Sequence, residues 1–165
     1  MNQPWQAALD AAIARRHAGE AAAALADFLA LAAAWPDTAV VHYHTAWCHD
    51  LLGQEAEAVP FYERALALGL DGKDRAGAYL GLGSTLRTLG QHERALAVLT
   101  AGVAAFPEDR GLLVFQAMAR YNTGQAKDAV SQLLTLLVAT TTDPDIRQYA
   151  RAIALYAEDL DRTWS

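Results

Sequence analysis

Three histidines and the only cysteine of the chain lie close together, at His42, His44, Cys48 and His49. Imidazole and thiolate groups are the usual ligands of zinc. On a helix, His44 and Cys48 share one face because they are four residues apart, whereas His42 and His49, seven apart, share another. A closed zinc site needs four ligands, and two on one face do not complete it. We therefore predict no metal and no other cofactor here.

Nucleophilic chemistry is not expected in this stretch either. His49 follows Cys48 directly and so points to a different side of a helix, and no glycine-rich turn for an oxyanion flanks the cysteine. The chain also lacks a phosphate-binding glycine loop, an HExxH motif and a nucleophile elbow. We predict no catalytic residue and no enzymatic activity. For His42 and His49 we favour buried, hydrogen-bonded core positions, and the alternative is a pH-sensitive packing role.

The elements that hold these residues are marked by four glycines. Gly19, Gly53, Gly90 and Gly124 are separated by 34, 37 and 34 residues. An alanine follows each glycine five residues later, and a larger apolar or aromatic residue follows nine residues later, namely Phe28, Tyr62, Leu99 and Leu133. A fixed period near 34 residues predicts an array of helix pairs. We expect the glycine to turn the chain, the alanine to allow close helix packing and the larger residue to fill the space beyond.

The repeat resembles the tetratricopeptide repeat family, whose pattern is W-x2-L-G-x2-Y, then A-x3-F, then P. The third unit matches best, through Tyr79, Leu82, Gly83, Leu86, Ala95, Leu99, Gly102 and Pro107. The resemblance implies an all-α fold, a right-handed superhelical α-solenoid of four helix pairs with a C-terminal capping helix. We place the repeats at about 5–38, 39–75, 76–109 and 110–143 and the cap at about 144–163, all within a single domain over 1–165. The tail, which includes Trp164, looks like that of small stand-alone bacterial repeat proteins.

Two places depart from a plain repeat. The longer glycine interval puts three extra residues in the segment 68–74, which predicts a longer turn with Asp71 as a helix cap. Near the end of the chain, Asp143 and Pro144 predict the start of a ninth helix, with proline in its first turn. We expect that helix to run to about residue 162 and to cover the last repeat.

In this family, the first helix of each repeat lines the concave surface. The resemblance therefore implies the partner-binding residues Arg16, Tyr43, Trp47, Asp50, Ser84, Arg87, Met118, Tyr121 and Asn122. Aromatic and arginine side chains commonly dominate such binding surfaces, and we expect Tyr43 and Trp47 to form an aromatic surface together. The alternative is that several of these residues pack one repeat against the next. Gly77, Gly81 and Gly83 predict a bare patch that admits a ligand backbone or a neighbouring helix.

Composition limits the class of partner. A net charge of −6 argues against nucleic acid, which needs clustered lysine and arginine. A lone cysteine fits a reducing compartment, and the first residues lack the segments of a signal peptide, so we expect a cytoplasmic location. No apolar run is long enough to span a membrane. We predict a protein-interaction module that binds a protein or peptide in its groove. The alternative is a homodimer in which the groove or the terminal helix pairs with a second copy.

Overall fold

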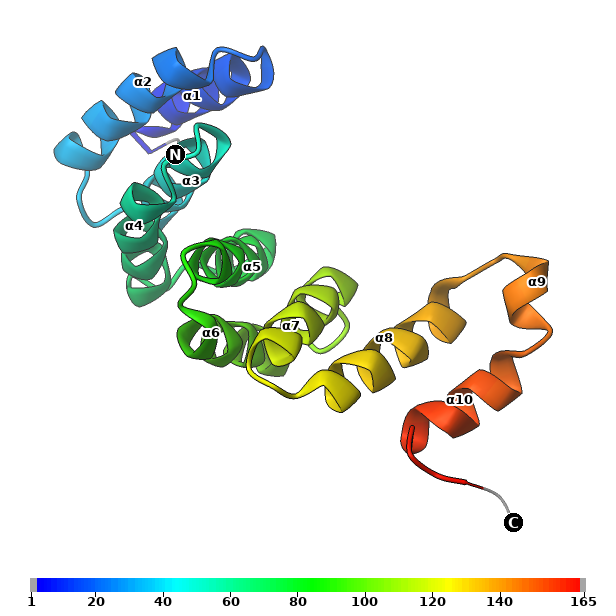
Figure 1. The fold of residues 1–165 in the computed structure, drawn as a ribbon. Coiled ribbons are helices and arrows are strands. Elements are labelled where there is room, and N and C mark those ends of the chain that lie inside the picture. The colour runs from blue at the N-terminus through cyan, green and yellow to red at the C-terminus, as the bar shows by residue number, and fades with distance from the viewer. Residues whose placement is uncertain (1–2, 164–165) are drawn as a thin grey trace. The chain divides into compact units, whose positions relative to one another are not determined.

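The computed structural model describes residues 3–163, which contain ten α-helices and no strand (Figure 1). Met1, Asn2, Trp164 and Ser165 lie outside the described residues. The chain divides into two compact units, Met1–Gln91 (unit 1) and His92–Ser165 (unit 2). The all-α composition agrees with the prediction. None of the helices within residues 3–163 is both long and apolar enough to cross a membrane.

Unit 1 contains five helices in which α3 is central. The helices are α1 (Gln6–His17), α2 (Ala21–Ala34), α3 (Ala39–Leu51), α4 (Glu55–Ala67) and α5 (Gly72–Thr88). Consecutive helices pack on one another, and α3 contacts each of the other four. A change in α3 therefore reaches every element of this unit.

The turns within the helix pairs share one backbone geometry. Gly19, Gly53, Gly90 and Gly124 all have positive φ values, between 69° and 86°. After Gly53, the amide of Gln54 bonds to the carbonyl of His49 at 3.0 Å, and the same bond recurs at the other three turns. This is a Schellman ending, which requires a left-handed residue that glycine adopts without a steric penalty. The repeated glycine therefore sets where each first helix ends, as predicted.

The repeated alanines are buried in every pair. Their exposed fractions are 0% for Ala24, Ala58 and Ala95 and 3% for Ala129. The larger residues one turn later follow the prediction in three repeats out of four, since Phe28, Tyr62 and Leu99 are at most 2% exposed. Leu133 is an exception at 39% exposed. The segment that follows α8 bonds to that helix at Ser131 and Lys127.

The three extra residues lengthen a helix instead of a turn. We predicted a longer loop over 68–74, but α5 already begins at Gly72 and runs for 17 residues. Asp71 is the N-cap residue as predicted, although its side chain makes no capping hydrogen bond. Its backbone carbonyl accepts the amide of Arg75 at 3.0 Å. A short turn with positive φ at Gly69 precedes the helix, so the added residues extend its first turn.

Unit 2 contains α6 (His92–Ala105), α7 (Arg110–Asn122), α8 (Ala126–Thr140), α9 (Pro144–Arg147) and α10 (Ala150–Glu158). Helix α7 packs on both α6 and α8, and α10 packs on α8. The capping segment begins at Asp143 and Pro144 as predicted, and Asp143 caps the amide of Asp145 at 2.9 Å. The prediction of a single helix that runs to about residue 162 was wrong. At Tyr149 the amide bonds three residues back, to Ile146, and α10 starts afresh after this tightened turn.

Candidate functional site

The histidines of α3 lie in two different environments, on opposite sides of the helix. His42 and His49 are 7% and 6% exposed, and both rings stack on Phe61 at centroid distances of 5.9 and 5.4 Å. His42 donates through Nε2 to the carbonyl of Pro36, and His49 donates through Nδ1 to Oε1 of Gln54, both at 2.8 Å. This pair is thus confirmed as buried, hydrogen-bonded core histidines.

His44 lies on the opposite side of α3 and supports an arginine. Its Nδ1 accepts a hydrogen bond at 3.1 Å from Arg16, whose guanidinium can only donate. The guanidinium carbon lies 3.9 Å from the centroid of the Trp47 ring, and the His44 ring stacks between Trp47 and Phe28. Burial, followed by the charges of Arg16 and His17, lowers the pKa of His44 to about 4. His44 is therefore neutral at pH 7 and holds Arg16 beneath Trp47.

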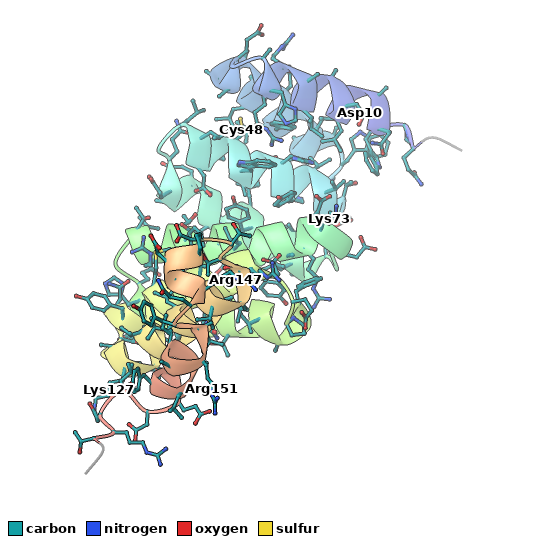
Figure 2. The ribbon with its side chains drawn as sticks, turned by 90° about the vertical axis from the view of Figure 1, so that its right-hand side faces the viewer. Asp10, Cys48, Lys73, Lys127, Arg147 and Arg151 are labelled. Atoms are coloured by element: carbon teal, nitrogen blue, oxygen red, sulfur yellow. The ribbon has the colours of Figure 1, made fainter. Side chains whose placement is uncertain are left out.

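Cys48 is enclosed where α2 and α3 meet in unit 1 (Figure 2). Its side chain is 0% exposed, and its thiol donates to the carbonyl of Ala21 at 3.1 Å. Burial raises the pKa of the thiol, so the thiolate that a nucleophile needs is disfavoured. Among residues 3–163, no three His, Cys, Asp or Glu side chains are grouped so that they could hold a metal ion.

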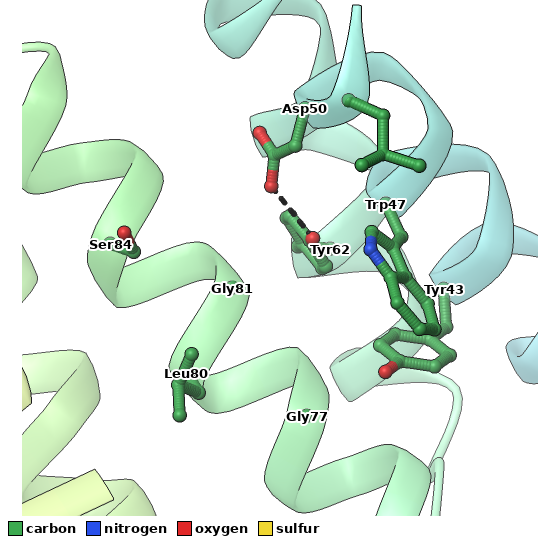
Figure 3. Close-up of a pocket in the computed structure, with 9 residues that line it drawn as sticks. Tyr43, Trp47, Asp50, Tyr62, Gly77, Leu80, Gly81 and Ser84 are labelled. Atoms are coloured by element: carbon green, nitrogen blue, oxygen red, sulfur yellow. Dashed lines mark hydrogen bonds between the residues drawn. The ribbon is translucent and has the colours of Figure 1, made fainter. Parts of the chain in front are cut away.

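A pocket of about 370 Å³ opens between α3 and α5, within unit 1 (Figure 3). We call it the α3–α5 pocket. Its lining comes from three helices and consists of Tyr43, Trp47, Asp50, Leu51, Tyr62, Gly77, Leu80, Gly81 and Ser84. Four of the predicted partner-binding residues, Tyr43, Trp47, Asp50 and Ser84, are among them. The sequence therefore indicated which face of α3 and α5 meets this pocket.

Tyr43 and Trp47 form the predicted aromatic surface along α3. Their ring centroids are 5.9 Å apart, and Tyr62 of α4 lies 6.3 Å from Tyr43. Tyr43 is 8% exposed, whereas Trp47 is 37% exposed. Trp47 therefore presents open aromatic surface that Arg16 supports from behind.

Tyrosine rings fill the space beside two of the α5 glycines in the predicted bare patch. A Cβ atom on Gly77 would lie 2.3 Å from the Tyr43 hydroxyl oxygen, and one on Gly81 would lie 2.5 Å from the Tyr62 ring. We predicted that the patch would admit a ligand backbone or a neighbouring helix. The second alternative is confirmed at Gly77 and Gly81, because tyrosine side chains of the neighbouring helices α3 and α4 occupy the space beside them.

Asp50 places a carboxylate at the edge of the pocket. The Tyr62 hydroxyl donates to it at 2.7 Å, and the Thr85 hydroxyl lies 2.9 and 3.0 Å from its two oxygens. Burial raises the pKa of Asp50, the two hydroxyls lower it, and the nearby Glu55 raises it again, with raised as the net direction. Asp50 is a half-buried carboxyl group that two neutral hydroxyls hold in place.

Two other predicted residues of unit 1 lie away from the pocket lining. Arg16 is 5% exposed, so it is placed to position Trp47 instead of meeting a partner directly. We revise its proposed role accordingly. Arg87 is half-buried on α5 and does not line the α3–α5 pocket.

The remaining predicted residues lie on α7 of unit 2. Met118, Tyr121 and Asn122 share one face of that helix because they are three and four residues apart. Tyr121 is 68% exposed, and the other two are half-buried. Their contact with a partner stays a prediction.

Tyr62 is the pocket residue that sequence reasoning missed. The repeat register assigned it to the core as a space-filling residue, and it is indeed only 2% exposed. Its hydroxyl nevertheless reaches Asp50, and its ring lines the pocket. Burial and the adjacent carboxylate raise the pKa of Tyr62 far above its usual range, so it acts as a donor. A tyrosine at this repeat position, where the family has phenylalanine, was the available signal.

Comparison with known proteins decides the family. Residues 39–160 match the family described as tetratrico peptide repeat. The chain belongs to this family. Among solved structures, a MamA double mutant superimposes with a TM-score of 0.75 at 19% identity, covering 96% of this chain and 88% of that one. YrrB, a TPR protein with an unusual peptide-binding site, gives a TM-score of 0.71 at 22% identity, covering 93% and 78%. No curated protein matches this sequence.

The tetratricopeptide repeat (TPR) assignment agrees with the array of helix pairs predicted from the glycine spacing and with the α-solenoid that the resemblance implied. Identities near 20% carry the fold alone, so the site must be argued from this chain. Family membership supports a general role in protein interaction.

Proposed function

We propose that this TPR protein is an interaction module that binds a peptide or helix of a partner protein across the α3–α5 pocket. One observation carries the proposal, namely that Trp47 is 37% exposed while Arg16 holds it from behind at 3.9 Å. Rigid, partly exposed aromatic side chains in a pocket are the usual energetic centre of a binding surface. The peptide-binding site named for the structural neighbour YrrB is consistent with this role. We also propose that the four repeats and the cap form one domain.

A peptide selection with a matched tryptophan control tests the proposal. We expect the full chain to enrich binders from a phage-displayed random peptide library, and Trp47→Ala to weaken the best binder about 30-fold or more. Trp35 is 38% exposed and does not line the pocket, so Trp35→Ala should leave affinity unchanged. Absence of any enriched peptide, or an equal loss in both variants, would overturn the proposal.

A second candidate is a homodimer through unit 2. Val130, Leu133 and Leu137 are 38–44% exposed and share one face of α8, because they are spaced by three and four residues. If this face pairs with a second copy, sedimentation velocity should show a dimer that Leu133→Glu dissociates. A monomer at all concentrations would exclude this alternative and leave the pocket proposal intact.

A further inference from the structure

Asp50 is the single charged side chain among the residues that line the α3–α5 pocket. Two charged side chains act on its pKa, Glu55 by raising it and His49 by lowering it, and neither is a lysine or an arginine. A half-buried carboxylate is costly unless an opposite charge or hydrogen bonds compensate for it. The ionised form of Asp50 therefore gains from a cation that a ligand brings.

Hydrogen bonding within the chain does not use the whole capacity of this carboxylate. A carboxylate has about four lone-pair sites for hydrogen bonds. Tyr62 supplies one proton, and Thr85 has a single hydroxyl proton that the carbonyl of Gly81, at 2.8 Å, also competes for. Asp50 therefore receives at most two hydrogen bonds from these hydroxyls and has sites left for a further donor.

The acidic character extends past Asp50. A second hollow of about 190 Å³ is lined by Asp50, Glu55, Ser84, Thr85 and Thr88. It shares Asp50 and Ser84 with the α3–α5 pocket, and its other members add one carboxylate and two hydroxyls. The α3–α5 pocket itself also has apolar and aromatic lining, which includes Trp47 and Leu80 (Figure 3). An occupant that suits both kinds of lining has an apolar stem and a cationic end.

We propose that the α3–α5 pocket takes a lysine side chain of the bound peptide, with its methylene groups against Trp47 and Leu80 and its ammonium group on Asp50 and Ser84. The inference rests on the proposed peptide-binding function and specifies its ligand chemistry. Long basic side chains bury their stems on apolar surface while the charged end meets polar groups. The volume of about 370 Å³ leaves room for such a chain.

Arginine fits this pocket less well for two reasons. A guanidinium binds best when both carboxylate oxygens are free for a bidentate pair, whereas both oxygens of Asp50 already face Thr85. The ring of Trp47 already carries the Arg16 guanidinium at 3.9 Å, and a second guanidinium stacked on it would meet that charge. A compact ammonium needs neither arrangement.

The pocket can be tested directly with a small probe in the full-length protein. We expect Nα-acetyl-lysine methylamide to shift the NMR signals of the Trp47 indole and of the Gly77 and Gly81 amides. Acetylation of the probe's Nε atom, or the substitution Asp50→Asn, should weaken binding about tenfold or more, since each removes a charge-assisted hydrogen bond. Asp128→Asn makes the same charge change on α8, outside the pocket lining, and should alter affinity less than twofold. Equal binding of the acetylated probe, or no binding of either probe, would overturn the lysine inference.

The peptide selection then separates this inference from the proposed function. Peptides enriched by the unmodified chain should share a lysine at one position, and replacing it with acetyl-lysine or glutamine should cost about tenfold. Asp50→Asn should still enrich peptides but without that lysine, whereas Trp47→Ala should enrich few or none. Enriched peptides with no preferred lysine would overturn the inference while leaving the peptide-binding function standing. Circular dichroism checks that Asp50→Asn stays folded, since asparagine keeps an acceptor for Tyr62.

Discussion

The space beyond the repeated alanine is filled by Phe28 and Tyr62 in unit 1, but by Leu99 and Leu133 in unit 2. Both aromatic residues are buried and contact polar groups, since Phe28 lies against Arg16 and Tyr62 against Asp50. In unit 2, by contrast, Leu99 is buried and Leu133 is 39% exposed. The two units share glycine turns and buried alanines, so these set the pairing of helices. In unit 1, the larger residue of the second pair also lines a pocket, because the Tyr62 ring lies in the α3–α5 pocket.

The polar interior follows the same division. Unit 1 buries histidines and an arginine among aromatic rings, whereas unit 2 buries Gln116, which bonds to Thr100 and accepts from Gln132 at 3.1 Å. The glutamine network extends to Arg120, whose guanidinium donates to Gln132 at 2.8 Å, and these hydrogen bonds involve no histidine and no carboxylate. The comparison therefore predicts that stability and its pH dependence are concentrated in unit 1.

The largest expected effect is the loss of an aromatic core residue. Phe28→Ala should lower the free energy of unfolding by about 3–5 kcal/mol, because Phe28 is fully buried. Leu133→Ala should cost less than about 1 kcal/mol, because its side chain is 39% exposed. Urea unfolding followed by circular dichroism measures both. Similar losses in the two variants would remove the proposed contrast between the units.

The next effect is a loss of stability in mild acid. The pKa of His44 is about 4 in the folded chain, below the ordinary value of 6.5. The unfolded chain therefore takes up a proton that the folded chain does not, so stability present above pH 6.5 falls as the pH drops toward 4, by about 3 kcal/mol. His44→Gln, which keeps an acceptor for Arg16, should flatten this dependence in urea titrations. An unchanged pH dependence in His44→Gln would contradict the assignment of this effect to His44.

The smallest expected change in the free energy of unfolding comes from adding a methyl group beside the pocket. Gly81→Ala should destabilise unit 1 by about 1–3 kcal/mol, because the new Cβ would lie 2.5 Å from the Tyr62 ring. In unit 2, Gly111 is exposed within α7, so Gly111→Ala should stabilise by up to about 1 kcal/mol through helix propensity. Thermal unfolding of the two variants compares them. A stabilising Gly81→Ala would mean that Tyr62 moves aside easily.

Sequence reasoning recovered what depends on local chemistry. The turns at Gly19, Gly53, Gly90 and Gly124 and the buried alanines follow from residue types at fixed spacing. The face of α3 that carries Tyr43 and Trp47 follows from the same register. The prediction was wrong where three extra residues could lengthen either a loop or a helix. The residues before Arg75 extend α5 and not the loop.

The parts of the site that were missed depend on contacts between distant segments. Arg16 was expected at the surface, but its long side chain folds back under Trp47, 31 positions further along. The link from Tyr62 to Asp50 and Thr85 joins three helices, and no spacing within one repeat predicts it. Pairings of this kind become visible only when the helices are packed.

The enclosure of Cys48 has a chemical consequence for the whole protein. The chain's only thiol is 0% exposed and hydrogen-bonded to Ala21, so oxidants and alkylating reagents reach it only when α2 separates from α3. While the protein is folded, its thiol is therefore shielded from such reagents. Its reactivity toward such reagents reports the opening of unit 1, without any introduced label.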